Sequence, residues 1–105
     1  MIVIGTFAYA AKRLRGCIVL DLQWRGNRAE GTIHIPDAVA AQIQDTEYAQ
    51  FESGQSFLLP IGLGLGVTLA ALTSVDFCIC GDTTAWREEW GNFEYLTPGA
   101  EEFPH

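Results

Sequence analysis

Two cysteines separated by a single residue, Cys78 and Cys80, are the first candidates for chemistry in this chain. Zinc sites usually separate paired cysteines by two to four residues so that both thiolates reach one tetrahedral ion, and this pair is too close. In a strand both thiols would point to one face, where Cys17 or His34 would have to complete a ligand set. The residues that alternate with the pair are apolar, which is typical of a covered strand. We therefore predict buried thiols, with no metal and no cofactor.

The segment that follows these cysteines combines acidic and aromatic residues. A short helix over 84–90 would place Trp86 and Trp90 on one face at four-residue spacing, with Asp82 near its N-terminus. Two carboxylates beside an aromatic wall are what glycoside hydrolysis requires. A pair formed by Asp82 and Glu88 would depend on the turn between them, and carboxylates near the start of a helix are ordinarily solvated. We assign no catalytic residue.

The two tryptophans must nevertheless be covered by something. A buried tryptophan hides roughly 150–250 Å² of surface, worth about 4–6 kcal/mol as an upper estimate, so the rings belong in the core, in a subunit interface or in a pocket. His34 joins the pocket hypothesis because it is the one internal residue that titrates near neutral pH. The candidate ligand-binding residues are Trp86, Trp90, Asp82, Glu88 and His34.

A glycine-rich segment invites comparison with phosphate-binding loops. Gly62, Gly64 and Gly66 alternate, but the third glycine of a G-x-G-x-x-G motif would fall on Val67 or Leu69, and no Walker lysine follows. If the segment is extended, the glycines form a strip without side chains, which is typical of a bulge, a bend or a close approach of another element.

Charge is distributed unevenly along the 105 residues, which are short enough for a single domain over 1–105. Residues 1–35 carry a net charge of +3 and residues 36–105 a net charge of −10, for a total of −7. A field of this sign repels phosphate backbones and excludes nucleic acid as a partner. Opposite charges on the two halves would instead favour contact within the fold or between subunits of a homo-oligomer.

Cellular location is inferred from the cysteines and the N-terminal region. An odd number of cysteines is typical of reduced thiols. The positive charges follow the first apolar run, which is the reverse of their order in a signal peptide, so we expect a cytoplasmic protein. The uncharged run Ser53–Val75 is long enough to span a bilayer, but Pro60, its glycines and its acidic flanks disfavour a membrane protein.

A β-hairpin is the element that the sequence predicts most sharply. Strands over 17–24 and 29–35 flank the turn residues Gly26 and Asn27, and glycine in the first turn position suits a type II′ turn. The resulting register places apolar residues on one face and polar residues on the other. The predicted pairs are Arg25 with Arg28, Trp24 with Ala29, Leu22 with Gly31, Leu20 with Ile33, and Ile18 with Ile35.

The remaining elements complete an α+β fold. We predict a main helix over about 37–50, capped by Asp37, with Val39, Ala40 and Ile43 on its apolar stripe. Further strands are expected over 2–9, 57–61, 67–73, 75–80 and 93–96. Together these elements predict a strongly bent antiparallel sheet or half-open barrel of about six strands, with one main helix and a short helix near 84–90.

Two classes of function are compatible with these residue patterns. The first is a small, soluble, non-enzymatic binding or interaction protein that self-associates through its apolar strands, because the run 53–75 is uncharged and no catalytic signature is present. The alternative is a small enzyme or a pocket for an apolar or cationic small molecule, built from Trp86 and Trp90 with Asp82 and Glu88. A protein ligand would fit the first class.

Overall fold

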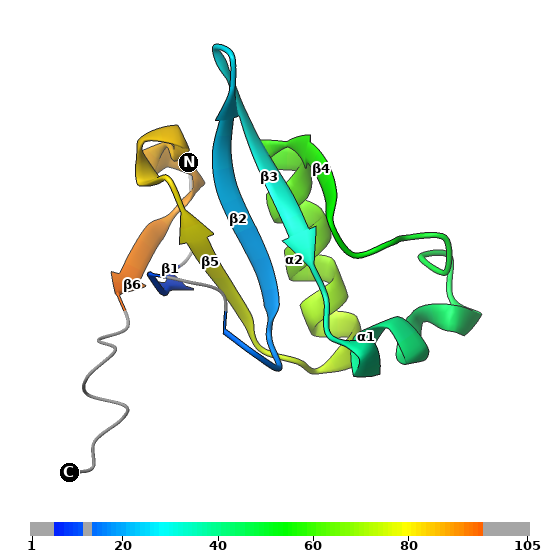
Figure 1. The fold of residues 1–105 in the computed structure, drawn as a ribbon. Coiled ribbons are helices and arrows are strands. Elements are labelled where there is room, and N and C mark those ends of the chain that lie inside the picture. Colours follow the sequence, from blue (N-terminus) through cyan, green and yellow to red (C-terminus); the bar gives the residue numbers. More distant parts are fainter. Residues whose placement is uncertain (1–5, 12–13, 96–105) are drawn as a thin grey trace, which may run out of the picture.

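The computed structural model describes residues 6–11 and 14–95, which form an α+β fold with a six-stranded sheet that is not closed into a barrel (Figure 1). The strand order is β4-β3-β2-β5-β1-β6. The strands are β1 (Thr6–Tyr9), β2 (Ile18–Arg25), β3 (Arg28–His34), β4 (Gln55–Leu58), β5 (Phe77–Gly81) and β6 (Asn92–Tyr95). The helices are α1 (Asp37–Gln42), α2 (Leu59–Thr73) and the 3-10 helices η1 (Ile43–Asp45), η2 (Thr83–Ala85) and η3 (Glu88–Trp90).

The β2–β3 hairpin has the predicted register. Arg25 pairs with Arg28, Trp24 with Ala29, Leu22 with Gly31, and Leu20 with Ile33. Gly26 has a φ angle of +66°, as the first central position of a type II′ turn requires. Gly31 is needed for another reason: a Cβ atom there would lie 2.5 Å from Cδ1 of Leu20. The alternation of apolar residues and the turn sequence therefore predicted the register of this hairpin correctly.

The predicted α+β class and six strands are confirmed, but the sheet is mixed and not antiparallel throughout. Within residues 6–11 and 14–95, β2–β3 and β3–β4 pair antiparallel, whereas β5 pairs in parallel with both β2 and β1, and β1 pairs in parallel with β6. For β5, the reason is the connection that leads to it from β4. A helix there carries the chain back across the sheet, and such a crossover joins parallel strands.

The main helix is α2, in a place where the sequence predicted strands over 57–61 and 67–73. Pro60 lies in the first turn, where a missing N–H costs no helical hydrogen bond. Ser74 ends the helix in the left-handed conformation with φ of +57°. The glycines and leucines are equally apolar on all sides, so no helical periodicity distinguished this segment from a covered strand.

Gly62 and Gly66 explain how α2 approaches the sheet. They are four residues apart and both are buried. An added Cβ atom would lie 3.2 Å from Leu20 Cδ1 at Gly62 and 2.5 Å from Phe77 Cε1 at Gly66. Each glycine weakens an isolated helix by roughly 1 kcal/mol, so the close contact with the sheet must offset this cost.

The helix predicted over 37–50 is shorter than expected. It begins at Asp37, but Pro36 occupies the N-cap position and Asp37 caps nothing. After η1, the backbone becomes extended at Thr46, whose hydroxyl donates to the Ile43 carbonyl at 2.8 Å and accepts from the Tyr48 N–H at 3.0 Å. A threonine hydroxyl that bonds locally to the backbone competes with helix formation, and here it ends the helix.

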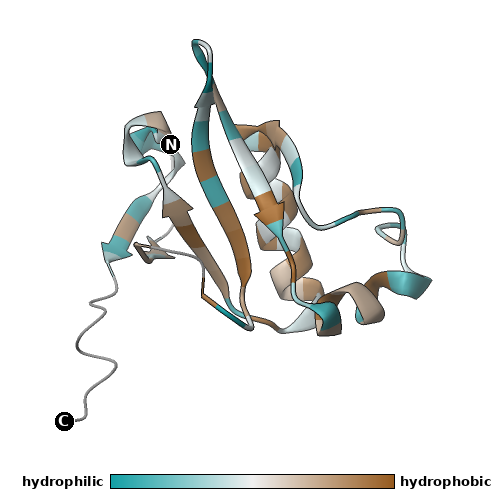
Figure 2. Ribbon diagram, in the orientation of Figure 1, coloured by the Kyte–Doolittle hydropathy of each residue, from teal (hydrophilic) through white to brown (hydrophobic). Residues whose placement is uncertain are grey.

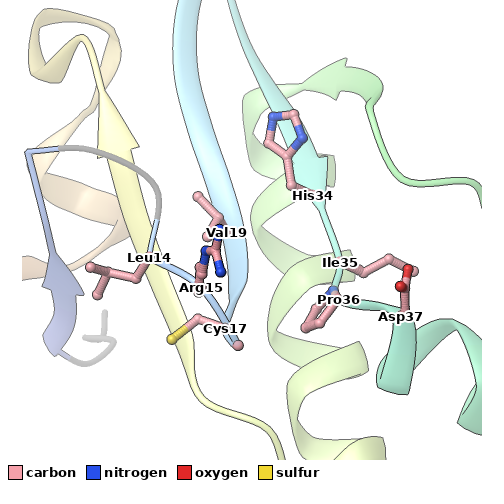
Figure 3. A pocket seen from close by; sticks show the side chains of 9 residues that line it. Leu14, Arg15, Cys17, Val19, His34, Ile35, Pro36 and Asp37 are labelled. Atoms are coloured by element: carbon pink, nitrogen blue, oxygen red, sulfur yellow. The ribbon is translucent and has the colours of Figure 1, made fainter.

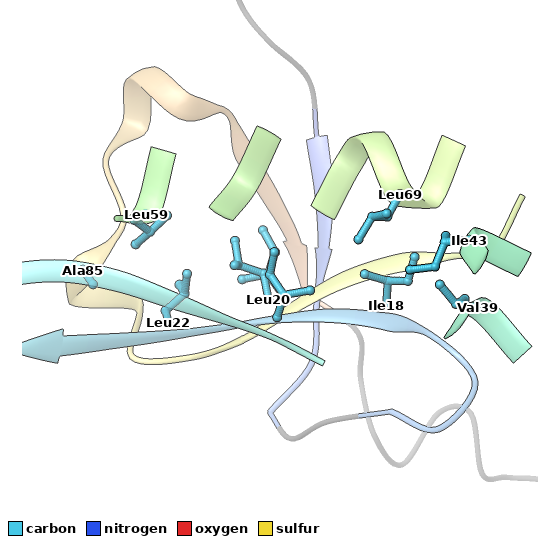
Figure 4. Packing of buried hydrophobic residues seen from close by; sticks show 10 residues of the cluster. Ile18, Leu20, Leu22, Val39, Ile43, Leu59, Leu69 and Ala85 are labelled. Atoms are coloured by element: carbon cyan, nitrogen blue, oxygen red, sulfur yellow. The ribbon is translucent and has the colours of Figure 1, made fainter. Parts of the chain in front are cut away.

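The core lies between α2 and one face of the sheet (Figure 4). In Figure 1, α2 lies behind β2 and β3 and thus covers this face. The fully buried members of the core include Ile18, Leu20, Leu22, Ile33, Val39, Ile43, Leu59, Leu69 and Ile79. A smaller buried group on the opposite face contains Val19, Cys78 and Cys80. The cysteines are therefore buried at the end of a covered strand.

The predictions at the two ends of the chain can be compared with the structure only in part. Of the expected strand over 2–9, residues 2–5 lie outside the described part, and β1 contains the rest. Leu96 lies outside it as well. The short helix expected over 84–90 is replaced by η2 and η3, because Trp86 between them has an extended backbone. No helix in residues 6–11 and 14–95 has both the length and the apolar character needed to cross a bilayer.

Candidate functional site

The two tryptophans lie together in an aromatic cluster formed by Phe7, Trp86, Trp90 and Phe93. The centroids of the Trp86 and Trp90 rings are 5.3 Å apart, and the planes of the two rings are nearly perpendicular. Trp86 also lies 4.8 Å from Phe93 and 5.9 Å from Phe7. Its indole N–H donates to the Gly91 carbonyl at 3.0 Å, so the polar atom of the ring has a partner within the chain. The cluster packs against the main core beside β5.

Asp82, a candidate ligand-binding residue in the sequence, caps the start of this segment. Its carboxylate accepts from the Thr84 N–H at 3.0 Å and from the Thr84 hydroxyl at 2.6 Å, which caps η2. These bonds lower the pKa of Asp82 below its ordinary value. The Thr84 hydroxyl also accepts from the indole N–H of the exposed Trp24 at 2.9 Å. Asp82 therefore acts as a cap in the structure.

The other predicted acid, Glu88, lies apart from this network. Glu88 begins η3 and is exposed, and among the described residues no hydrogen bond links it to Asp82. The neighbouring Glu89 forms an exposed ion pair with Arg87 at 3.4 Å. The structure thus brings Trp86 and Trp90 together but joins no second carboxylate to Asp82.

His34 lies in a separate region of the sheet. It pairs with Val19 near the start of β2, whereas the Asp82 N–H bonds to the carbonyl of Leu22 further along the same strand. His34 instead borders a cavity of about 540 Å³ at the end of the hairpin (Figure 3). The cavity is lined by Leu14, Arg15, Gly16, Cys17, Val19, His34, Ile35, Pro36 and Asp37.

The hairpin register brings the two walls of this cavity together. Residues 14–17 lead into β2, and residues 34–37 lead out of β3 into α1, so pairing of Val19 with His34 places the two segments side by side. Gly16 makes the first segment turn, with φ of +79°, and no atom lies within 4 Å of a Cβ added there. Figure 3 shows Leu14, Arg15 and Cys17 on one side and Ile35, Pro36 and Asp37 on the other.

The cavity carries one positive and one negative side chain on its rim. Arg15 and Asp37 are both exposed. Within the described part of the chain, the ion pairs are Arg25 with Glu30, Arg28 with Glu30, and Arg87 with Glu89. Arg15 and Asp37 therefore face the cavity without an ion-pair partner in that part of the protein.

The Cys17 thiol lines the cavity but is poorly suited to nucleophilic chemistry. It forms a hydrogen bond with Cys78, and burial raises the pKa of Cys17. Burial and the neighbouring Cys17 raise the pKa of Cys78 to about 11. Both thiols are then protonated at neutral pH, whereas the thiolate is the reactive form. Figure 3 also shows the Cys17 sulfur directed away from His34, which leaves no cysteine–histidine pair in this cavity.

Metal binding receives no support from these groups. In residues 6–11 and 14–95, no cluster of three or more histidine, cysteine, aspartate or glutamate side chains is arranged to hold an ion. Zinc needs three or four such ligands around one point.

The outward side of α2 forms a second kind of candidate surface. We define the outer face of α2 by the residues Pro60, Ile61, Gly64, Val67, Thr68, Ala71 and Leu72. All of these residues are exposed and none is charged. Ile61, Leu72 and Val67 are exposed by 58%, 50% and 40% respectively. Figure 2 shows that α2 is brown to white along its length, without the teal of hydrophilic residues.

Comparison of this chain with protein-family models, with curated proteins and with solved structures finds no match. The site must therefore be interpreted from its own geometry. Sequence reasoning missed Arg15 and Asp37 as cavity residues, and it missed the outer face because it predicted strands there. One available signal was the four-residue spacing of Gly62 and Gly66, which lies on one face of a helix.

Proposed function

We propose that this chain is an interaction protein that self-associates through the outer face of α2. One observation carries the proposal: Ile61, Val67 and Leu72 are 40–58% exposed on a helix face that has no charged residue. A helix that is apolar on every side is ordinarily buried on every side. The sheet covers only one side of α2, so a partner that covers the other is expected.

A second copy of the same chain fits this face for electrostatic reasons. Each copy carries a net charge of −7, so two copies repel each other over most of their surfaces. The outer face is uncharged, so a contact between two outer faces places no like charges against each other. A twofold axis between two such helices, at their contact, would also bury the same residues on both partners.

The small residues of the outer face favour close packing of two helices. Gly64 and Thr68 are four residues apart and lie between the larger Ile61 and Leu72. No atom lies within 4 Å of a Cβ added at Gly64, so another backbone has room to approach. The 15-residue helix is about 22 Å long at 1.5 Å per residue. A contact limited to it would be small, so we expect a reversible dimer.

Sedimentation equilibrium over a wide range of protein concentration tests this proposal. We expect the native chain to shift from monomer to dimer, and the double variant Ile61→Lys with Leu72→Lys to remain monomeric. Two charges placed on an apolar contact would be left unpaired and desolvated.

A matched control adds the same charge elsewhere. Asn27→Lys with Gln50→Lys changes two exposed residues outside the outer face and should dimerise like the native chain. A native chain that remains monomeric at all concentrations would contradict the proposal. So would a lysine variant of the outer face that dimerises as well as the control.

The small-molecule alternative remains a prediction for Trp86, Trp90, Asp82, Glu88 and His34. Packing of Trp86 and Trp90 against the core favours a structural role for the rings, and the capping bonds of Asp82 favour the same role for its carboxylate. The alternative is therefore the weaker of the two proposals for this set of residues.

A further inference from the structure

We propose that Cys17 and Cys78 form a redox-sensitive modification site, at which a small disulfide oxidises the two thiols to an intramolecular Cys17–Cys78 disulfide. The site lies on the face of the sheet opposite α2, so this inference does not depend on self-association through the outer face. It rests on the contact between the two thiols, on their unequal exposure and on the position of the third cysteine.

The two thiols lie against each other. Cys17 packs on the buried group that contains Val19, Cys78 and Cys80, and its thiol forms a hydrogen bond with the Cys78 thiol. Figure 3 shows the Cys17 sulfur on the side of β5, directed away from His34. To form a disulfide, the two sulfur atoms must approach from this contact to about 2.05 Å.

The chain around Cys17 leaves room for this approach. Val19 pairs with Cys78 in the parallel ladder of β2 with β5, and Cys17 lies two residues before Val19 on the same face. Two residues held in the ladder at this offset would be slightly too far apart for a disulfide. Cys17, however, precedes β2, and Gly16 turns the chain immediately before it with φ of +79°. The strand therefore does not hold Cys17, which can move towards Cys78.

The third cysteine is badly placed to compete. Cys80 pairs with Asp21, which follows Cys17 by four residues, so its offset from Cys17 is twice that of Cys78. Cys78 and Cys80 alternate in β5 and point to the same face, side by side rather than towards each other. The pair that fits a disulfide is therefore Cys17 with Cys78.

Unequal exposure of the two thiols determines the order of the steps. Cys17 is partly exposed and lines the cavity of about 540 Å³, whereas Cys78 is 2% exposed. A small disulfide therefore reaches Cys17 first. The Cys17 thiolate attacks one sulfur of the reagent, the S–S bond of the reagent breaks, and the departing thiolate takes up a proton.

The second step is intramolecular. Cys78 loses its proton and attacks the sulfur of Cys17, the mixed disulfide breaks, and the second half of the reagent leaves as a thiol. In total, two protein thiols are oxidised and one small disulfide is reduced to two thiols. Contact between the two cysteines favours this closure over attack by a thiol from another molecule. The product carries no charge, which suits its buried position.

Free-thiol counting after incubation with hydroxyethyl disulfide, an uncharged reagent, tests the proposal. Both thiols are protonated at neutral pH, so the exchange is run at about pH 8.5, where more thiolate is present. The chain is then unfolded in urea, alkylated with iodoacetamide and weighed by mass spectrometry. We expect the native chain to fall from three free thiols to one, with no reagent attached and no cross-linked dimer. Dithiothreitol should restore all three thiols.

Two variants assign the bond to its residues. Cys80→Ser keeps the proposed pair and should fall from two free thiols to none. Cys17→Ser keeps Cys78 and Cys80 and should retain both thiols. Because trypsin cleaves after arginine, the oxidised Cys80→Ser chain should yield peptide 16–25 linked to peptide 29–87. Circular dichroism of the reduced variants verifies that each is folded.

Three results would overturn the inference. They are three free thiols in the native chain after incubation, a mixed disulfide with the reagent that does not close, and loss of both thiols from Cys17→Ser. The lysine variant of the outer face should form the disulfide like the native chain. Loss of dimerisation with retained disulfide formation would show that failure of one proposal does not entail failure of the other.

Discussion

The aromatic cluster and the outer face of α2 are both apolar regions, yet they are accommodated in opposite ways. In the cluster, Trp86 contacts other rings at centroid distances of 4.8–5.9 Å and its indole N–H has a backbone partner. On the outer face, Ile61 and Leu72 remain at least half exposed. The rings of the first region are packed against one another, whereas the second region is exposed in the part of the chain that the structure describes.

This difference shows that the amount of apolar surface does not by itself identify an interface. A buried tryptophan stabilises the fold by up to about 4–6 kcal/mol, so the aromatic cluster contributes to folding of a single chain. The outer face of α2 contributes little to that stability, because its side chains stay in water. Its apolar area becomes favourable only when a partner covers it.

The largest difference between the two regions is expected when one large side chain in each is truncated and the free energy of unfolding is measured. We expect Trp86→Ala to lower the free energy of unfolding by about 3–5 kcal/mol, because it removes a ring packed on several others. Leu72→Ala should change it by no more than about 0.5 kcal/mol. Urea unfolding of dilute protein measures both, and equal losses would show that the two regions do not differ in this way.

Two glycines of α2 allow a smaller, paired test of its two sides. An added Cβ at Gly66 collides with Phe77, so Gly66→Ala should lower the free energy of unfolding by about 1–3 kcal/mol. Gly64 faces open space, so Gly64→Ala should raise it by about 0.5–1 kcal/mol through reduced freedom of the unfolded chain. Urea unfolding at low protein concentration distinguishes them. If Gly64→Ala proved the destabilising variant and Gly66→Ala the stabilising one, then α2 would turn a different face to the sheet.

The smallest expected effect is on the pH dependence of folding near Trp86 and Trp90, where Asp82 caps η2. Because hydrogen bonds to Thr84 lower the pKa of Asp82, the cap stabilises the fold above the ordinary carboxyl pKa and loses that effect as pH falls through the lowered value. In Asp82→Asn, near-ultraviolet circular dichroism of the tryptophans should therefore decline less steeply in acid than in the native chain.

Glu88→Gln provides the control for this experiment, because Glu88 is an exposed carboxylate of the same segment. Its acid transition should match that of the native chain. Identical acid transitions for Asp82→Asn and the native chain would contradict the role assigned to the cap.

Parts of the fold that depend on neighbouring residues could be predicted from the sequence. The β2–β3 register follows from the alternation of apolar residues and from a glycine in a turn that requires positive φ. The sequence offered Asp82 or Thr83 as a cap for this segment, and the structure shows that Asp82 has this role. The burial of Cys78 and Cys80 follows from their apolar neighbours in β5. Each of these inferences rests on interactions within a few residues or across one tight turn.

Other parts depend on contacts that the sequence does not display. An apolar, glycine-rich run is compatible with a covered strand or with a helix, and α2 is helical where Gly62 and Gly66 can approach β2 and β5. The parallel pairing of β5 depends in turn on that helix. Arg15 and Asp37 line one cavity although they are far apart in the sequence, because the hairpin places their segments side by side.

The sequence by itself determined the α+β class, the hairpin and the absence of a recognisable catalytic motif, because residue types and local spacing are sufficient for these. Only the tertiary structure decided which apolar residues are covered. Coverage depends on the direction in which each side chain points once the chain has packed. That packing places Trp86 and Trp90 against the core, and it leaves Ile61 and Leu72 at the surface.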